Sequence, residues 1–181
     1  MVRIAVLVSG GGTNLQALID AQSRGELKNG RIAAVLSSRP DAYALERAAR
    51  AGIPGYVVAR KDFASNREMT IALVDKLREL NIGLVVLAGF LHILTGEMVA
   101  AFPNAILNVH PALIPSFCGA GYYGLHVHEA ALAYGVKLTG ATVHFVNEEP
   151  DGGPIVLQKA VEILEGDTPE AVSYTHLRAH E

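Results

Sequence analysis

Two polar residues that suit acyl chemistry follow an apolar run in the middle of the chain. Residues 105–107 (AIL) precede Asn108 and His110, and Pro111 comes next. Because successive strand residues point to opposite faces, the amide and the imidazole of a strand here point the same way. Pro111 cannot donate to a sheet, so the strand is expected to end at His110. An amide that polarises a carbonyl, beside a ring that moves a proton, fits acyl transfer.

The same two residues also fit a simpler structure. A buried strand end can use an Asn and a His only to cap loop carbonyls, and the Asn-x-His pattern alone favours that interpretation. The case for chemistry therefore depends on the segments that surround this strand.

The composition restricts the class of protein. The chain has 181 residues, of which 50% are hydrophobic and 18% charged, as expected for one globular domain. The net charge is −3 and no Lys/Arg block occurs, so we expect no nucleic-acid partner. The single cysteine excludes a disulfide framework and a Cys-rich zinc site. Residues 1–12 indicate a first strand and not a signal peptide. No apolar run approaches the ~20 residues that a helix needs to span a bilayer. We therefore expect a cytoplasmic protein without a membrane partner.

A glycine turn follows the first predicted strand. Residues 3–9 (RIAVLVS) are almost entirely apolar, Gly10–Gly12 come next, and a helical pattern begins at Thr13. A strand, a glycine turn and a helix together aim free backbone N–H groups at an anion, most often phosphate. Leu15 replaces the third glycine of GxGxxG, and the Walker lysine is missing. The turn therefore predicts a phosphate site of neither standard type, and the alternative is a tight turn without a ligand.

Strands and helices alternate along most of the chain. This order predicts an α/β fold with a doubly wound, mostly parallel sheet. Strands are expected at 3–9, 31–38, 56–59, 84–88, 105–110, 138–146 and 154–164, and helices at 13–19, 41–52, 65–80, 96–102 and 127–134.

Later segments add weaker signals. The acidic loop 147–153 ends in Asp-Gly-Gly, which permits a tight path that presses Asp151 inward, although an ordinary hairpin turn explains the loop equally well. The Gly/aromatic loop 117–124 is expected to be mobile or to cover something. His126 and His128 lie two apart in a predicted helix and face apart, so no metal site is expected, and His144 is expected to be a packed strand residue.

Four segments together resemble a known family. SGGGTN (9–14), LVVLAGFLHIL (84–94), LNVHPALIPS (107–116) and PDGGPI (150–155) occur in the order found in formyltetrahydrofolate-dependent formyltransferases. The resemblance covers residues 1–172 and implies a Rossmann-like formyltransferase fold. It also implies transfer of a formyl group from 10-formyltetrahydrofolate, a co-substrate, to the amine of glycinamide ribonucleotide in purine biosynthesis. No metal is implied.

The resemblance assigns the site residues. The catalytic trio is Asn108, His110 and Asp151: the amide and a protonated imidazole donate to an oxyanion, and the carboxylate favours the protonated imidazole. The ribonucleotide phosphate is assigned to Gly11, Gly12, Thr13 and Asn14. The folate is assigned to Arg67, Phe90, Leu91, His92, Ile93, Leu94, Asn147, Glu148, Glu149 and Pro150.

The chain departs from the family pattern in three places. His92 replaces an arginine of better-known bacterial members, and the loop 117–124 is longer than theirs. From residue 173 the sequence SYTHLRAHE lacks a helical apolar pattern and the acids of the family's C-terminal helix, which a last strand follows. We therefore expect a formyltransferase domain at 1–172, incomplete at its C-terminus, and a non-native tail at 173–181.

Other functions remain open from the sequence. One class is another formyltetrahydrofolate-using enzyme, of the deformylase or methionyl-tRNA formyltransferase type. A second is a non-catalytic nucleotide-binding module that uses the turn 10–14, and a third is an inert truncated chain. The sequence does not fix the oligomeric state.

Overall fold

The computed structural model describes residues 1–178, with side chains through Ser173. Within this range the strands are hydrogen-bonded in the order β3-β2-β1-β4-β5-β6-β7. The chain forms two compact units, residues 1–107 and the segment from residue 108 onward. The predicted mostly parallel α/β sheet is confirmed.

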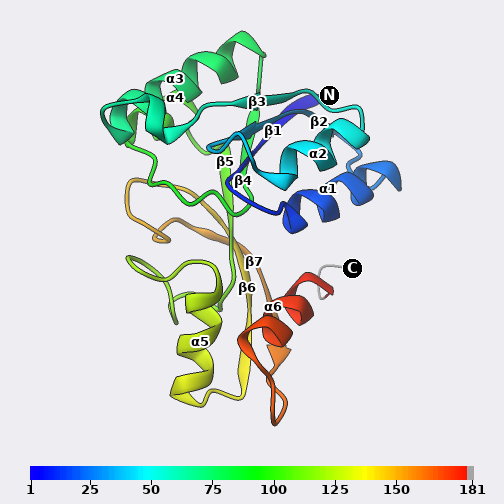
Figure 1. Ribbon diagram of the computed structural model, residues 1–181, viewed down its shortest axis with the longest axis vertical. Coiled ribbons are helices and arrows are strands. Elements are labelled where there is room, and N and C mark those ends of the chain that lie inside the picture. The colour runs from blue at the N-terminus through cyan, green and yellow to red at the C-terminus, as the bar shows by residue number, and fades with distance from the viewer. Residues whose placement is uncertain (179–181) are drawn as a thin grey trace. The chain divides into compact units, whose positions relative to one another are not determined.

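The first unit is a doubly wound α/β layer. Its strands β1 to β4 pair in parallel, and Figure 1 shows α1 and α2 on one side of them and α3 and α4 on the other. Strand interiors are apolar because both faces are covered by helices. The elements are β1 (Val2–Val8), α1 (Thr13–Ser23), β2 (Gly30–Ser37), α2 (Tyr43–Arg50), β3 (Gly55–Val57), the 3-10 helix η1 (Arg60–Asp62), α3 (Asn66–Glu79), β4 (Leu84–Leu87) and α4 (Gly96–Ala101).

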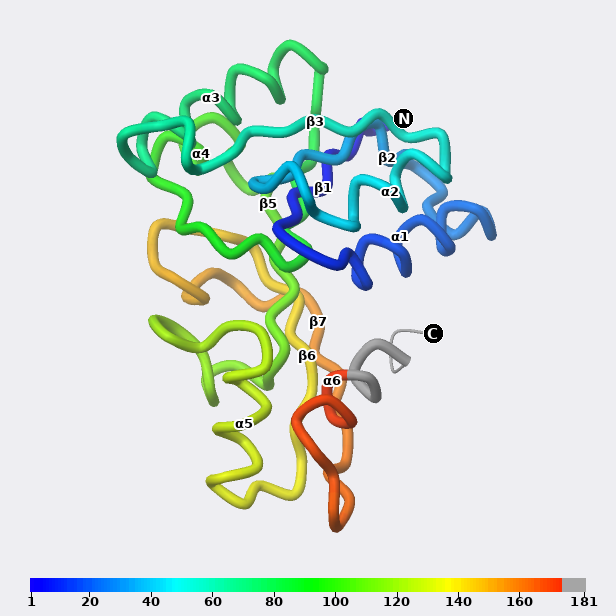
Figure 2. The backbone as a smooth tube through the Cα atoms, viewed as in Figure 1, coloured from blue at the N-terminus to red at the C-terminus, as the bar shows by residue number. Residues whose placement is uncertain are grey.

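The second unit begins within β5 (Ile106–His110), the strand that carries Asn108 and His110. It continues with α5 (Leu125–Tyr134), β6 (Leu138–Phe145), β7 (Ile155–Glu162) and α6 (Pro169–Arg178). Strands β6 and β7 pair antiparallel, and Figure 2 shows them running side by side from the loop that joins them. This loop, residues 146–154, carries the predicted carboxylate.

The helix α6 runs into the segment 173–181, where the apolar pattern did not indicate a helix. Local chemistry explains its start: the Thr168 hydroxyl accepts the N–H of Ala171 at 3.2 Å, and Pro169 occupies the first helical position. Residues 179–181 lie outside the described residues. The assignment of 173–181 as a non-native tail stays a prediction.

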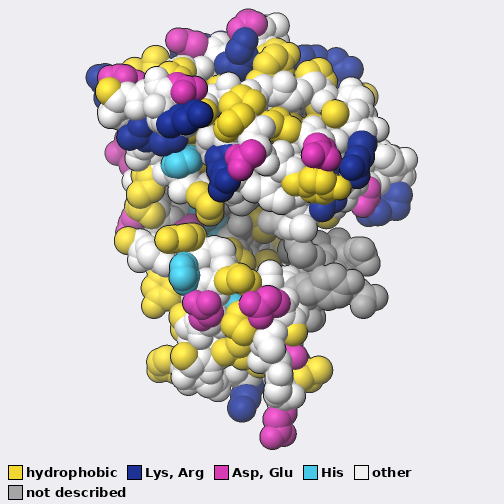
Figure 3. Space-filling view, viewed as in Figure 1, with side chains coloured by type: hydrophobic (Ala, Val, Ile, Leu, Met, Phe, Trp, Pro, Cys, Tyr) yellow, Lys and Arg dark blue, Asp and Glu magenta, His cyan; other side chains and the backbone are white. Residues whose placement is uncertain are grey.

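The surface carries charges of both signs. On the face shown in Figure 3, Lys and Arg side chains lie among Asp and Glu side chains. Among residues 1–178 no helix is long and apolar enough to span a bilayer.

Gly153 gives the first testable prediction, because a Cβ built there would lie 1.7 Å from the carbonyl oxygen of Phe145. We expect Gly153→Ala to lower the free energy of unfolding by about 3 kcal/mol, since backbone must move to relieve the overlap. Gly83→Ala is the control, because its nearest neighbour beyond the adjacent residues is a Val2 methyl at 3.4 Å. Urea unfolding of both variants measures the difference, and equal midpoints would contradict the prediction.

Candidate active site

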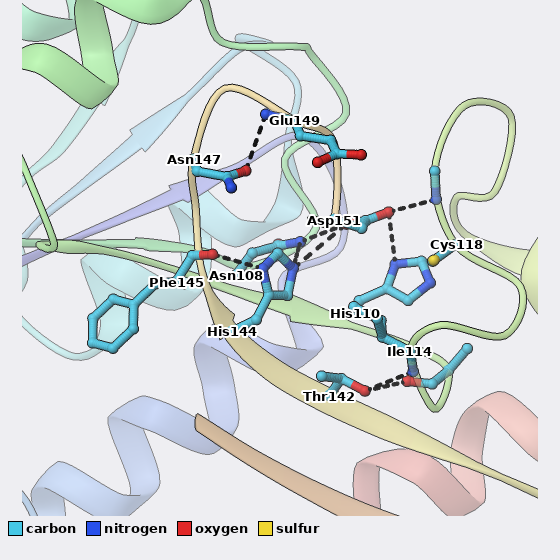
Figure 4. Close-up of polar contacts among 12 residues, drawn as sticks. Asn108, His110, Ile114, Cys118, Thr142, His144, Phe145, Asn147, Glu149 and Asp151 are labelled. Atoms are coloured by element: carbon cyan, nitrogen blue, oxygen red, sulfur yellow. Dashed lines mark hydrogen bonds and ion pairs between the residues drawn. The ribbon is translucent and has the colours of Figure 1, made fainter. Parts of the chain in front are cut away.

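The predicted catalytic residues lie together in the second unit. Asn108 and His110 come from the end of β5, and Asp151 comes from the loop that follows β6. Figure 4 shows Asp151 between the His110 ring on one side and the Asn108 and His144 side chains on the other. Asn108 and His110 both reach this carboxylate, which confirms that the two side chains share one face of the strand.

Asp151 is the centre of the cluster, and its side chain is only 14% exposed. Its Oδ2 accepts the N–H of Gly119 at 2.9 Å and lies 3.6 Å from His110 Nδ1. Its Oδ1 lies 3.4 Å from Asn108 Nδ2 and 3.5 Å from His144 Nε2. Each carboxylate oxygen therefore faces one ring nitrogen and one amide N–H donor.

The backbone of the loop aims this carboxylate. Asp151 has φ of 55°, in the left-handed region where Asp is one of the tolerated non-glycine residues. The Gly152 N–H donates to the Glu149 carbonyl at 3.0 Å, and the Glu149 N–H donates to the Asn147 side chain at 3.0 Å. The two turns direct residue 151 toward the strand ends, so the Asp-Gly-Gly segment does more than close a hairpin.

His144 is an addition to the predicted trio. Its ring is 1% exposed, and its Nδ1–H donates to the Phe145 carbonyl at 2.9 Å. This bond leaves Nε2 facing Asn108 Nδ2 at 3.2 Å and Asp151. A neutral ring accepts from the amide there, whereas a protonated ring donates to the carboxylate.

Charge and burial compete at both members of this pair. Burial by itself lowers the pKa of His144, but the hydrogen bonds to Asp151 and Phe145 and the Asp151 charge outweigh it, so the pKa is raised. Burial by itself raises the pKa of Asp151, but His144, the Gly119 N–H and the His110 charge outweigh it, so the pKa is lowered. The contacts therefore favour a charged imidazolium–carboxylate pair.

His110 is held by a backbone carbonyl from the Gly/aromatic loop. Its Nε2–H donates to Phe117 O at 2.8 Å, and its side chain is 5% exposed. Phe117 has φ of 48°, which belongs to the tight path of the loop 117–124. The loop thus contributes two backbone groups to the cluster, the Phe117 carbonyl and the Gly119 N–H.

Cys118 lies between those two groups, and it is a poor nucleophile. Burial raises the pKa of its thiol, and the Asp151 charge raises it further. The Sγ–H donates to the Pro115 carbonyl at 3.4 Å. The sulfur therefore stays a protonated thiol near neutral pH.

The remaining predicted residues are placed within each unit. Gly12 caps α1 with φ of 71°, so Thr13 and Asn14 begin the helix as expected for an anion site. Arg67 pairs with Glu97, whose pKa falls to about 2 through its hydrogen bonds to Thr95 and Arg67.

The predicted folate segment divides between the units. Leu91 and Ile93 are exposed apolar side chains of the first unit, and the Phe90 and His92 rings meet edge to face at 5.7 Å. Burial lowers the pKa of His92, and the Arg60 charge adds to the effect. Asn147, Glu148, Glu149 and Pro150 belong to the second unit, in the loop that aims Asp151.

The sequence around His144 carries a signal for its role. Thr142 and His144 are polar residues two apart near the end of β6, the same spacing as Asn108 and His110, and both are buried. Two such strands indicate polar faces that meet. No comparable signal marked the backbone groups of the loop 117–124.

The described part of the chain holds no group of three or more His, Cys, Asp or Glu side chains arranged to bind a metal ion. His126 instead pairs with Glu129 at 2.9 Å on α5.

The raised pKa of His144 and the lowered pKa of Asp151 predict a pH-dependent stability. The histidine contribution is complete below the ordinary histidine pKa of ~6.5 and is lost as pH rises through the raised value. The carboxylate contribution is complete above ~3.9 and is lost as pH falls through the lowered value. The pair therefore contributes most between these two pH values.

In Asp151→Asn, His144 keeps its hydrogen bond to the Phe145 carbonyl but loses the charge and the hydrogen bond of Asp151, so burial favours the neutral ring more than in the wild type. The wild-type advantage in stability over this variant should therefore shrink as pH rises from 5.5 to 8.5. Urea midpoints of both proteins at the two pH values measure this change. An advantage that does not depend on pH would show that no charged pair forms.

Comparisons with known proteins agree with this geometry. A family model described as formyl transferase matches residues 2–181. Phosphoribosylglycinamide formyltransferase of Haemophilus influenzae is 48% identical over 172 residues, which cover 95% of this chain and 78% of that protein. The Escherichia coli protein of the same name is 40% identical over 172 residues, with the same two coverages.

A solved structure shows the same fold. The crystal structure of glycinamide ribonucleotide transformylase 1 from Symbiobacterium toebii matches with a TM-score of 0.92 and 46% identity, covering 99% of this chain and 82% of that one. The resemblance carried by the four sequence segments is confirmed. The chain belongs to the formyl transferase family.

Proposed function

We propose that this protein transfers the formyl group of 10-formyltetrahydrofolate to the amine of glycinamide ribonucleotide. The observation that carries the proposal is the convergence of Asn108, His110 and Asp151 in one buried polar cluster. The names of the relatives supply the substrate, because both proteins compared above are phosphoribosylglycinamide formyltransferases.

The reaction needs hydrogen-bond donors and one mobile proton. The amine nitrogen attacks the formyl carbon, a C–N bond forms, and the carbonyl oxygen becomes an oxyanion. The bond to the folate nitrogen then breaks, the carbonyl re-forms, and the proton lost by the attacking amine is balanced by a proton on the departing nitrogen. Donors aimed at the oxyanion stabilise the transition state in which this charge develops.

Asn108 and His110 are proposed as those donors. The Asn108 amide already points its Nδ2 into the cluster, where it donates to Asp151 or His144. A protonated His110 is also proposed as the acid that delivers a proton to the departing folate nitrogen.

The ring contacts indicate which nitrogen of His110 performs this role. Nε2–H is held by the Phe117 carbonyl at 2.8 Å, a full hydrogen bond. Nδ1 is 3.6 Å from Asp151, beyond hydrogen-bond length. Nδ1, which lies beside Asp151 without a full hydrogen bond, is therefore proposed to carry the proton that moves, while the Phe117 carbonyl fixes the ring.

Asp151 is proposed to be the fixed negative charge beside His110. Its lowered pKa keeps the carboxylate ionised, so the charge is present where the ring transfers its proton. His144 shares the same carboxylate through the other oxygen, which anchors Asp151 from the side away from His110.

The substrate sites extend the proposal to the other assigned residues. The ribonucleotide phosphate is proposed to bind Gly11, Gly12, Thr13 and Asn14 at the start of α1. The folate is proposed to bind Arg67, the apolar segment Phe90–Leu94 and the loop Asn147–Pro150. The exposed Leu91 and Ile93 supply apolar surface for a flat ring.

A cytoplasmic location and the absence of nucleic-acid partners stay predictions.

A formyl-transfer assay tests the function. The protein should formylate glycinamide ribonucleotide, and His110→Ala should reduce kcat by about 10²–10³ or more, because a donor and a proton are both lost. His126→Ala is the matched control, since this exposed histidine contacts Glu129 and the Tyr123 ring and no residue of the catalytic trio among the described contacts. Its kcat should stay within about twofold.

Two outcomes would contradict the proposal. If both histidine variants retain the wild-type rate, His110 is not the acid. If the wild type releases formate from 10-formyltetrahydrofolate equally fast without the ribonucleotide, the deformylase alternative is correct.

A further inference from the structure

The glycine turn before α1, residues 10–12, accepts hydrogen bonds from the first two turns of α2. The Ala44 N–H donates to the Gly10 carbonyl at 3.1 Å. One turn later on the same helix, Arg47 Nε donates to the Gly11 carbonyl at 2.8 Å. Two successive carbonyls of the turn are thus fixed toward α2.

Packing makes the same contact tight. A Cβ built on Gly12 would lie 2.6 Å from the Ala44 Cβ and 2.9 Å from the Ala44 Cα. Gly12 also has φ of 71°, which a side chain rarely adopts. The third glycine of the turn is therefore required by α2 as well as by the backbone path.

Arg47 joins the turn to α1. Its Nη1 donates to the Gln16 side chain at 3.1 Å, and Gln16 is the residue whose N–H donates to the Gly12 carbonyl at 2.9 Å. The guanidinium carbon also lies 5.0 Å from the centre of the Tyr43 ring. A planar group with several donors is required to make these contacts together.

The charge of Arg47 is left without an anionic partner. Its hydrogen-bond acceptors are a carbonyl and an amide, and no carboxylate oxygen of the described residues lies within 4.0 Å of its nitrogens. Arg50, which lies over the same Tyr43 ring at 5.4 Å, is instead paired with Glu46. One cation of α2 is neutralised locally, and the one beside the glycine turn is not.

We propose that Arg47 is a positioning residue for the ribonucleotide phosphate, an inference that rests on the proposed function. It holds the Gly11 carbonyl on the α2 side, so that the first N–H groups of α1, which no side chain caps, remain for the phosphate. Its positive charge adds to the field of the helix N-terminus. Its effect is on binding of the phosphate and not on the formyl transfer step.

Calorimetric titration with ribose 5-phosphate tests the role without any formyl chemistry. Arg47→Gln should weaken the binding of ribose 5-phosphate at least tenfold. Arg47→Lys keeps the positive charge but loses the planar set of N–H donors, and it should weaken binding about threefold. Arg50→Gln is the control: it removes the same charge from the same helix and the same aromatic ring, and its Kd should stay within about twofold of wild type. In turnover assays Arg47→Gln should raise the KM for the ribonucleotide and leave kcat and the KM for 10-formyltetrahydrofolate within about twofold.

Three results would overturn the inference: equal Kd values for Arg47→Gln and Arg50→Gln, no binding of ribose 5-phosphate by the wild type, or a loss of kcat in place of a rise in KM. If Arg47→Gln does not fold, the Kd of Arg47→Lys decides, and a value equal to wild type overturns it. If the wild type binds ribose 5-phosphate but transfers no formyl group, the proposed function fails and the Arg47 comparison remains decisive.

Discussion

The buried carboxylate of Asp151 is the interaction on which the second unit depends. A carboxylate with so little exposure is costly unless donors and positive charge surround it. Here the Gly119 N–H and the Asn108 amide donate to it, and the His144 and His110 rings lie beside its two oxygens. These groups come from a strand end, a neighbouring strand and a loop. Because all of these groups contact the same carboxylate, it fixes their positions relative to one another. A site whose groups are held in place in this way is preorganised.

Polar contacts hold the segments that surround that carboxylate. The Thr142 hydroxyl donates to the Ala112 carbonyl at 2.7 Å and accepts the Ile114 N–H at 3.1 Å, which fixes the chain just after His110. Gly153 lies against the Phe145 carbonyl and sets where the loop returns to β7. Each of these contacts joins β6 to a segment that carries a site residue, so β6 is the template of the site.

The sequence predicted the periodic parts of the molecule. Every predicted strand and helix is present, with ends shifted by at most two residues at the matched boundaries, apart from α1, which extends beyond residue 19. Asn108 and His110 could be paired because strand alternation is a local rule. Asp151 could not be placed from spacing alone, since it depends on a left-handed residue and a loop return. The roles of Arg47 and of the Phe117 carbonyl left no pattern in the sequence. Arg47 donates to the Gly11 carbonyl and His110 donates to the Phe117 carbonyl, so each partner is a backbone group in a different segment of the chain.

The hydrogen bonds from Ala44 and Arg47 of α2 to the glycine turn have a consequence for which ligands this turn can distinguish. If the phosphate binds at this turn as proposed, peptide N–H groups contact the phosphoryl oxygens, and the sugar attached to them makes no contact with the turn. Inorganic phosphate and other sugar phosphates would then occupy the same place. Discrimination among metabolites would have to arise where the nucleophilic nitrogen meets the one-carbon donor.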